Sequence, residues 1–142
     1  ETPSAWCFDL AGCVGVDTGP LLLFAGEGLA YEEAADRWST LPENEYADPF
    51  LDGKATAWTG RLAVVWGGGS YEAEEDAPPA RVAPGGAAYD PSATTWTALP
   101  AAPVPTRARA RAVWTGAEFI VWGGESGYAE RTQFADGAAW TP

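Results

Sequence analysis

The chain has 142 residues, a formal net charge of −12 and one lysine, Lys54. This charge argues against nucleic acid and anionic membranes as partners, because both are bound through basic surfaces. The hydrophobic content of 46%, with eight tryptophans, excludes a disordered chain. Apolar runs are far shorter than the roughly 20 residues of a membrane-spanning helix. Frequent glycine (17) and proline (12) favour many short strands joined by turns in an all-β domain.

The first segment of the chain holds both cysteines, Cys7 and Cys13. A small disulfide loop between them predicts an oxidising compartment, so that the protein is expected to be secreted, periplasmic or at the cell surface. Two buried free thiols are the alternative. No histidine occurs, the cysteine spacing is not CxxC, and the acidic residues follow no calcium-loop spacing. We therefore expect no metal and no cofactor.

A ten-residue pattern recurs along the chain. Residues 59–68 (TGRLAVVWGG) reappear at residues 115–124 (TGAEFIVWGG), and a looser copy (TGPLLLFAG) lies at residues 18–26. Each copy predicts a tight turn, a short apolar strand and glycines that end it. A short strand of mostly small residues is expected before each turn, at residues 12–17, 53–58 and 107–114. Small residues suit an innermost strand, where repeated units crowd together.

A hairpin pattern follows two of these copies. Tyr31 precedes Trp38 by the same interval that separates Tyr89 from Trp96, and a Leu-Pro pair follows each tryptophan. The polar residues 90–95 (DPSATT) form a turn in which proline presets the bend. The spacing therefore predicts a strand that ends at tyrosine and another that begins at tryptophan, which gives four strands per unit.

This four-strand unit resembles the kelch repeat of galactose-oxidase-like central domains, in which an apolar strand with Gly-Gly is followed by a spaced Tyr and Trp. The resemblance implies a β-propeller with four-stranded kelch-type blades. Three blades are expected, at about residues 11–41, 53–99 and 107–140, the last completed by a strand at residues 4–8. The histidine that kelch repeats usually carry on the inner strand is missing from every copy.

The two ends of the pattern are complementary. Residues 136–142 match residues 84–91 up to the turn, and Trp6 lies in a tryptophan strand that no tyrosine strand precedes. The preferred expectation is a head-to-tail homodimer in which each N-terminal strand completes the partner's last blade, closing a six-bladed ring. A longer single-chain propeller, of which these residues are a part, is the alternative.

Three of the seven arginines alternate at Arg107, Arg109 and Arg111. A regular strand would place all three on one face. The kelch resemblance implies that arginines near the start of the inner strand line the mouth of the central channel and bind acidic groups of partner peptides. Guanidinium groups suit such bidentate contacts. The alternative is that these arginines pair with Asp and Glu of neighbouring blades.

Aromatic residues are expected in two roles. Trp66 and Trp122 end apolar strands and are predicted in the core, while the tryptophans at the blade rim are predicted to pack between blades. Tyr71 and Tyr128 follow the Gly-Gly elements and are candidates to stack on a sugar or a partner protein. The acidic, proline-bearing loop at residues 69–84 is a candidate partner-binding flap.

These patterns favour a non-enzymatic binding or assembly module that recognises a protein or glycan ligand at the channel mouth or the loops. Without histidine, neither a galactose-oxidase-type copper site nor a Ser-His or Cys-His nucleophile can be built from this chain. The alternative is a glycan-directed hydrolase or lyase that uses Arg107, Arg109 and Arg111 with an acidic residue.

Overall fold

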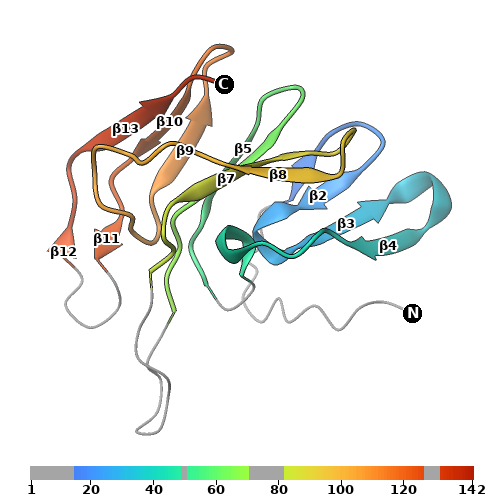
Figure 1. Ribbon diagram of the computed structural model, residues 1–142, viewed down its shortest axis with the longest axis horizontal. Coiled ribbons are helices and arrows are strands. Elements are labelled where there is room, and N and C mark those ends of the chain that lie inside the picture. Colours follow the sequence, from blue (N-terminus) through green and yellow to red (C-terminus); the bar gives the residue numbers. More distant parts are fainter. Residues whose placement is uncertain (1–14, 49–50, 71–81, 127–131) are drawn as a thin grey trace, which may run out of the picture.

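The computed structural model describes residues 15–48, 51–70, 82–126 and 132–142, which form antiparallel sheets with almost no helix (Figure 1). Sheet 1 contains β1 (Val16–Asp17), β2 (Leu22–Phe24), β3 (Leu29–Glu32) and β4 (Arg37–Thr40). Sheet 2 contains β5 (Ala55–Trp58), β6 (Ala63–Trp66), β7 (Gly86–Asp90) and β8 (Thr95–Ala98). Sheet 3 contains β9 (Arg111–Trp114), β10 (Phe119–Trp122) and β13 (Gly137–Trp140). These sheets confirm the expected all-β class.

The remaining elements are short. A two-stranded ribbon is made by β11 (Glu125–Ser126) and β12 (Thr132–Gln133). Single 3-10 turns are η1 (Ala25–Glu27), η2 (Glu33–Ala35) and η3 (Glu45–Ala47). None of the helical turns in the described parts of the chain is long and apolar enough to span a membrane.

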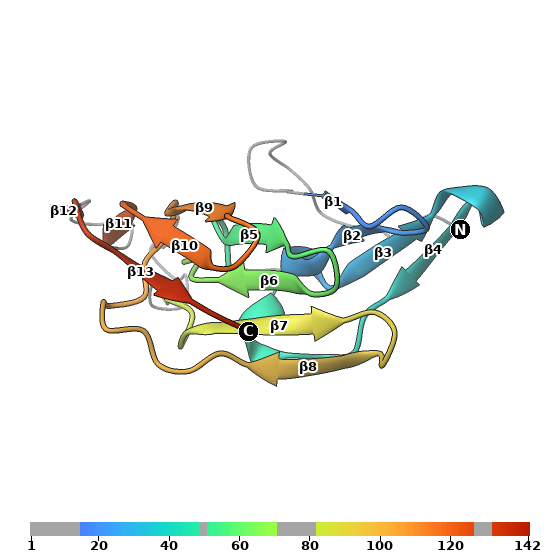
Figure 2. The ribbon, with the colours of Figure 1, turned by 90° about the horizontal axis from the view of Figure 1, so that it is seen from above.

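Sheets 1 and 2 have the strand order predicted for the repeat unit, with each strand pairing with the next. Strand β5 contacts both β1 and β9, so the first strands of the three sheets are neighbours. In Figure 2, β1, β5 and β9 lie along the upper edge, and the later strands of each sheet follow below them. The three sheets therefore share one side, which is formed by their first strands.

The Thr-Gly turn before β2, β6 and β10 has the same structure each time. The amides of Thr18, Thr59 and Thr115 donate to the carbonyl three residues ahead, at 2.9, 3.0 and 3.0 Å. Each threonine hydroxyl accepts a hydrogen bond from the amide of that same residue, at 3.3, 2.9 and 3.0 Å. The glycine after each threonine has a φ of 91°, 92° or 97°, a conformation that L side chains disfavour. The recurring dipeptide is thus explained by turn chemistry.

The core lies on both faces of sheet 2. Along β6, Ala63 and Val65 face sheet 1, where they pack with Leu23. Val64 and Trp66 face sheet 3, where they pack with residues that include Phe119. Successive strand residues point to opposite faces, so a strand that is apolar at every position is buried from both sides. This accounts for the uninterrupted apolar run Ala-Val-Val-Trp.

The predicted Tyr–Trp hairpins are confirmed. Tyr31 pairs with Trp38 and Tyr89 pairs with Trp96, with ring centroids 4.9 and 5.0 Å apart. The Trp96 indole N–H donates to the Pro42 carbonyl at 3.0 Å, which links β8 to the segment that follows sheet 1. Trp96 also packs on the core between sheets 1 and 2, as expected for a tryptophan between repeated units.

The first strands are shorter than the sequence predicted. Strands were expected over residues 53–58 and 107–114, but β5 begins at Ala55 and β9 at Arg111. Gly53 and Arg109 have φ values of 65° and 57°, a left-handed conformation that a strand cannot continue through. The prediction of one strand carrying three arginines on one face is therefore wrong.

Trp66 and Trp122 end equivalent strands but differ in exposure. Trp66 is 4% exposed, whereas Trp122 is 59% exposed, so the predicted core position is right for Trp66 and wrong for Trp122. Trp66 lies in the core between sheets 2 and 3. The face of sheet 3 that carries Trp122 has no sheet packed against it within the described residues, and this leaves the indole in solvent.

Candidate functional site

The segment that links sheet 2 to sheet 3 is held by backbone hydrogen bonds from both sheets. On the side of sheet 2, the Gly68 amide donates to the Arg107 carbonyl at 3.1 Å and the Arg109 amide donates to the Gly53 carbonyl at 2.7 Å. On the side of sheet 3, Ala108 and Glu125 exchange two hydrogen bonds of 3.1 and 2.9 Å. This bonding sets the backbone at residues 107–109 and hence the direction of the arginine side chains.

Arg107 is buried in that segment with 1% of its surface exposed. Its Nη1 forms an ion pair with Asp136 at 2.5 Å and donates to the Gly123 carbonyl at 3.3 Å, and its Nε donates to the Pro105 carbonyl at 2.9 Å. The guanidinium carbon lies 3.9 Å from the centre of the Phe134 ring. A charge with this many contacts fixes the segment to the end of sheet 3.

Arg109 and Arg111 are more accessible. Arg109 pairs with buried Glu125 at 3.0 Å while 46% of its side chain stays exposed. Arg111 is exposed at the start of β9. Two of the three candidate arginines therefore pair with acidic side chains of their own predicted unit, residues 107–140, and not with those of a neighbouring unit as the alternative had it. Arg109 and Arg111 are the arginines of this group that a ligand can reach.

Sequence reasoning did not identify Glu125, Asp136 and Phe134 as the partners of these arginines. The repeat nevertheless contained a signal. The unit with arginines at positions 107 and 109 has acids at positions 125 and 136, whereas the preceding unit has no charge at any of the four equivalent positions. Those equivalents are Leu51, Gly53, Gly69 and Gly85. When one repeat unit carries both arginines and acids at positions where another unit carries neither, the oppositely charged side chains are expected to pair.

The other predicted site residues lie outside the described residues. These are Tyr71, Tyr128, Cys7 and Cys13, together with most of the acidic loop at residues 69–84. The strand expected at residues 4–8 also falls there. In the part of the chain that the structure describes, no group of three or more Cys, Asp or Glu side chains is arranged to hold a metal ion.

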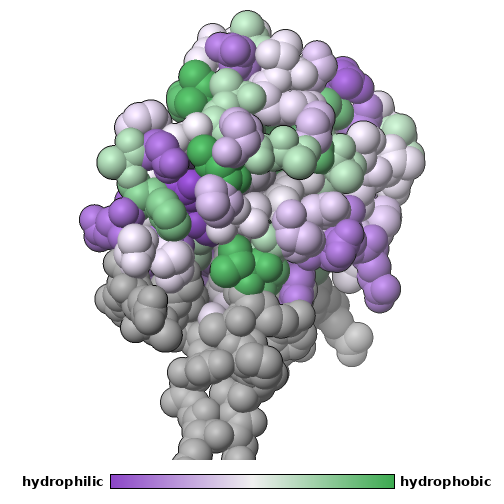
Figure 3. Space-filling view, turned by 60° about the vertical axis from the view of Figure 1, so that its left-hand side comes forward, coloured by the Kyte–Doolittle hydropathy of each residue, from purple (hydrophilic) through white to green (hydrophobic). Residues whose placement is uncertain are grey.

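The outer face of sheet 3 is a second candidate surface. Arg111 pairs with Trp122 across the strands and Val113 pairs with Ile120, so these four side chains share one face. Val113 and Trp122 are 54% and 59% exposed. Figure 3 brings this side of the molecule forward and shows hydrophobic residues between polar ones on its surface. The equivalent residues of sheet 2 are Ala55, Ala57, Val64 and Trp66, which contact sheet 3.

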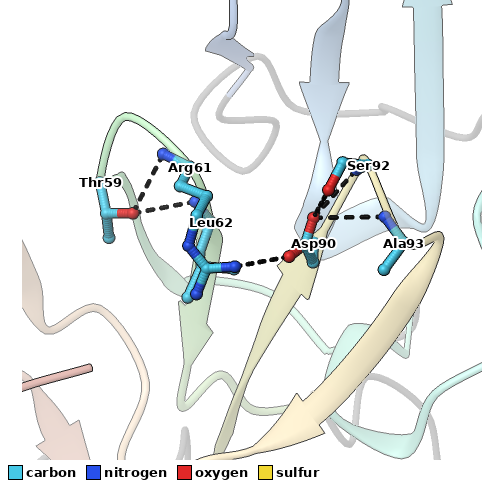
Figure 4. A network of polar contacts seen from close by, with 6 residues as sticks. All are labelled: Thr59, Arg61, Leu62, Asp90, Ser92 and Ala93. Atoms are coloured by element: carbon cyan, nitrogen blue, oxygen red, sulfur yellow. Dashed lines mark hydrogen bonds and ion pairs between the residues drawn. The ribbon is translucent and has the colours of Figure 1, made fainter.

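A polar network joins two turns at the far end of sheet 2 (Figure 4). Arg61 donates to Asp90 at 2.6 Å, and the other carboxylate oxygen of Asp90 accepts from the Ser92 hydroxyl at 2.6 Å and the Ser92 amide at 2.9 Å. The Ser92 side-chain hydrogen bond, helped by backbone amides and Arg61, lowers the pKa of Asp90. The network closes the predicted Pro-containing turn, and we assign it a structural role.

The comparisons with known proteins indicate the fold and no family. No protein-family model matches the chain, and no curated protein matches it. Among solved structures, one described as "Structure of YjhT" is similar, with a TM-score of 0.51 and 11% sequence identity over 87% of this chain. The match covers 50% of the YjhT chain, so this chain spans half the length of that neighbour. At this identity the similarity supports a shared all-β architecture alone.

Proposed function

We propose that this chain is part of a kelch-type β-propeller and works as a non-enzymatic binding and assembly module. Four-stranded antiparallel sheets that stack with their first strands together are the expected form of propeller blades. The repeat of turn, apolar strand, Gly-Gly, Tyr and Trp supports the kelch type. The proposal includes an oxidising location, which rests on Cys7 and Cys13.

The observation that carries the assembly role is the exposure of the outer face of sheet 3. Its equivalents in sheet 2 are buried by the next sheet, and Trp122 is 59% exposed where Trp66 is 4% exposed. Burying an aromatic side chain of this size contributes about 2 kcal/mol or more. A further sheet on this face is therefore favoured, supplied by a second copy in a six-bladed ring or by the remainder of a longer propeller.

The binding role is assigned to Arg109, whose side chain is 46% exposed. Arg109 lies where the first strands gather, which is the channel mouth of a closed propeller, whereas Arg111 shares the face of sheet 3 that a further sheet would cover. The guanidinium group of Arg109 suits the carboxylates of an acidic peptide or an acidic glycan. The hydrolase or lyase alternative has no comparable support, because the carboxylates that contact Arg107 and Arg109, those of Asp136 and Glu125, are taken up in ion pairs with them.

A ligand screen tests the binding role. On glycan arrays and in acidic-peptide pull-downs, we expect Arg109→Ala to weaken binding about 10-fold, since one charge-assisted hydrogen bond contributes roughly 1.5–3 kcal/mol. Arg37→Ala is the matched control, because Arg37 is an exposed arginine of sheet 1 that pairs with Glu32 at 2.7 Å. If no ligand depends on Arg109, or if Arg37→Ala weakens binding equally, the arginine site is wrong.

A further inference from the structure

Strand β13 ends sheet 3 beside two hollows. Among the described residues β13 pairs with β10 on one edge and with no strand on the other. A cavity of about 70 Å³ lies beside Trp140, Leu99 and Pro100. A second cavity, of about 250 Å³, lies between Trp140 and the side chains of Thr97 and Leu99. Both hollows are lined by Trp140 and Leu99, so they lie between the last described strand of sheet 3 and the residue that follows β8.

The corresponding place between sheets 1 and 2 is filled by Trp96. This indole packs on the core that contains Ala30 and Leu41, and its N–H donates to the Pro42 carbonyl at 3.0 Å. Trp96 also stacks beside Tyr89, its partner across the strands. A fourth-strand tryptophan thus uses three contacts: an aromatic side chain on the third strand, a leucine, and the carbonyl of the proline that follows it.

Each of these contacts has an equivalent beside β13. Leu99 and Pro100 occupy the positions of Leu41 and Pro42, and the amides of the two leucines donate to equivalent glycine carbonyls, both at 2.8 Å. Trp140 occupies the position of Tyr89, since they pair with the equivalent residues Phe119 and Ala63. Leu41 is 9% exposed and buried, whereas Leu99 is half-buried. The two hollows mark the place of an indole that the described residues do not supply.

We propose that the β13 edge and the two hollows form a docking site for an antiparallel strand that carries a tryptophan, and that residues 4–8 of a second copy occupy it. Trp6 takes the position of Trp96, with its indole N–H donating to the Pro100 carbonyl. Trp6 is the one tryptophan of the sequence outside the described residues. Main-chain hydrogen bonds along β13 supply affinity, and the hollow selects the indole. The inference rests on the proposed assembly function.

A second copy is the occupant that fills the docking site at β13 and also provides a docking site for the tryptophan strand of the first copy. Each copy carries one docking site and one tryptophan strand, so two copies in head-to-tail contact fill both sites and close. The pair then contains six sheets, within the four to eight that propellers use.

The test is a complementation experiment on full-length chains, with mass measured by sedimentation equilibrium. Trp6→Ala removes the indole, and Thr97→Arg fills the larger hollow from an exposed position that the fold does not need. We expect each variant alone to dissociate roughly 1,000-fold more readily than the wild type, because both docking sites of the pair lose the contacts of a buried tryptophan anchor, roughly 30-fold each. Mixed together, they should form a 1:1 pair, because one intact strand and one intact hollow remain.

Val82→Glu is the matched control, since Val82 is an exposed apolar residue away from both hollows. It should associate like the wild type. A wild-type dimer that neither Trp6→Ala nor Thr97→Arg weakens overturns the docking site and leaves the assembly function standing. A folded wild-type monomer overturns the second copy as the occupant, and leaves the longer propeller of the proposed function as the source of the strand. Failure of the mixture to pair also overturns the proposal.

Discussion

Replacing Arg107 with alanine is expected to lower the free energy of unfolding by about 3 kcal/mol. The side chain is 1% exposed, so its removal leaves a cavity. The Pro105 and Gly123 carbonyls lose a charged donor, Asp136 loses its ion pair, and Phe134 loses the guanidinium that stacks on it. Urea denaturation, followed by far-ultraviolet circular dichroism at a fixed protein concentration, measures the change.

Arg111→Ala is the matched control for this experiment. Arg111 has the same chemistry four residues ahead, but it is exposed and forms no ion pair with the described residues. Its replacement should change the stability by no more than about 0.5 kcal/mol. Equal effects of the two substitutions, or a negligible effect of Arg107→Ala, would show that the buried ion pair does not fasten the linking segment to sheet 3.

Of the two adjacent glycines Gly67 and Gly68, Gly67 is the one whose replacement by alanine is expected to lower the free energy of unfolding most. A Cβ at this position would lie 2.3 Å from the Arg107 carbonyl oxygen, which is backbone and cannot rotate away. Gly67 also has a φ of 71°. Left-handed strain and overpacking together cost about 4 kcal/mol. We expect the variant to unfold at much lower urea concentration or to accumulate unfolded.

Gly60→Ala separates the two causes. Gly60 has a φ of 92°, but a Cβ there meets no atom within 4 Å. Conformational strain alone should cost about 1 kcal/mol. If Gly67→Ala proves no worse than Gly60→Ala, the close approach of the linking segment to the Gly-Gly pair is not a constraint on the fold.

The repeat allowed most strands and turns to be predicted. The Thr-Gly turn depends on a threonine hydroxyl that accepts from an amide three residues ahead, and on a glycine that adopts a positive φ. Both features are local, so the sequence alone reveals them. The Tyr89–Trp96 hairpin is likewise set by a turn of known composition. The apolar run at residues 63–66 predicted strand β6, with Trp66 in the core. Local rules and strand period are sufficient for these features.

The arginine segment could not be predicted in the same way. Alternation at Arg107, Arg109 and Arg111 has strand period, yet hydrogen bonds to Gly53, Gly68 and Glu125 impose a left-handed residue in the middle. Two of those partners are more than 35 residues away in sequence. The repeat offered one clue, because Arg109 occupies the position of Gly53, which shares its left-handed φ. Long-range contacts thus overrode the local pattern.

The exposure of Trp122 was also beyond reach of the pattern. Its strand matches that of Trp66 closely, and the repeat treats the two as equivalent. Their environments differ because sheet 3 follows sheet 2, whereas within the described residues no sheet follows sheet 3. Whether such a tryptophan is buried depends on whether another sheet packs against its strand, and the similarity between the repeats does not reveal this.

The solution mass of the wild-type chain tests the central claim most directly. The exposed face of sheet 3 and the edge of β13 that pairs with no strand among the described residues are the two surfaces that the account assigns to a second copy. Light scattering coupled to size exclusion should therefore give a single species at twice the 14.9 kDa of one chain. A cooperatively folded species at 14.9 kDa, unchanged as the protein is concentrated, would contradict the account.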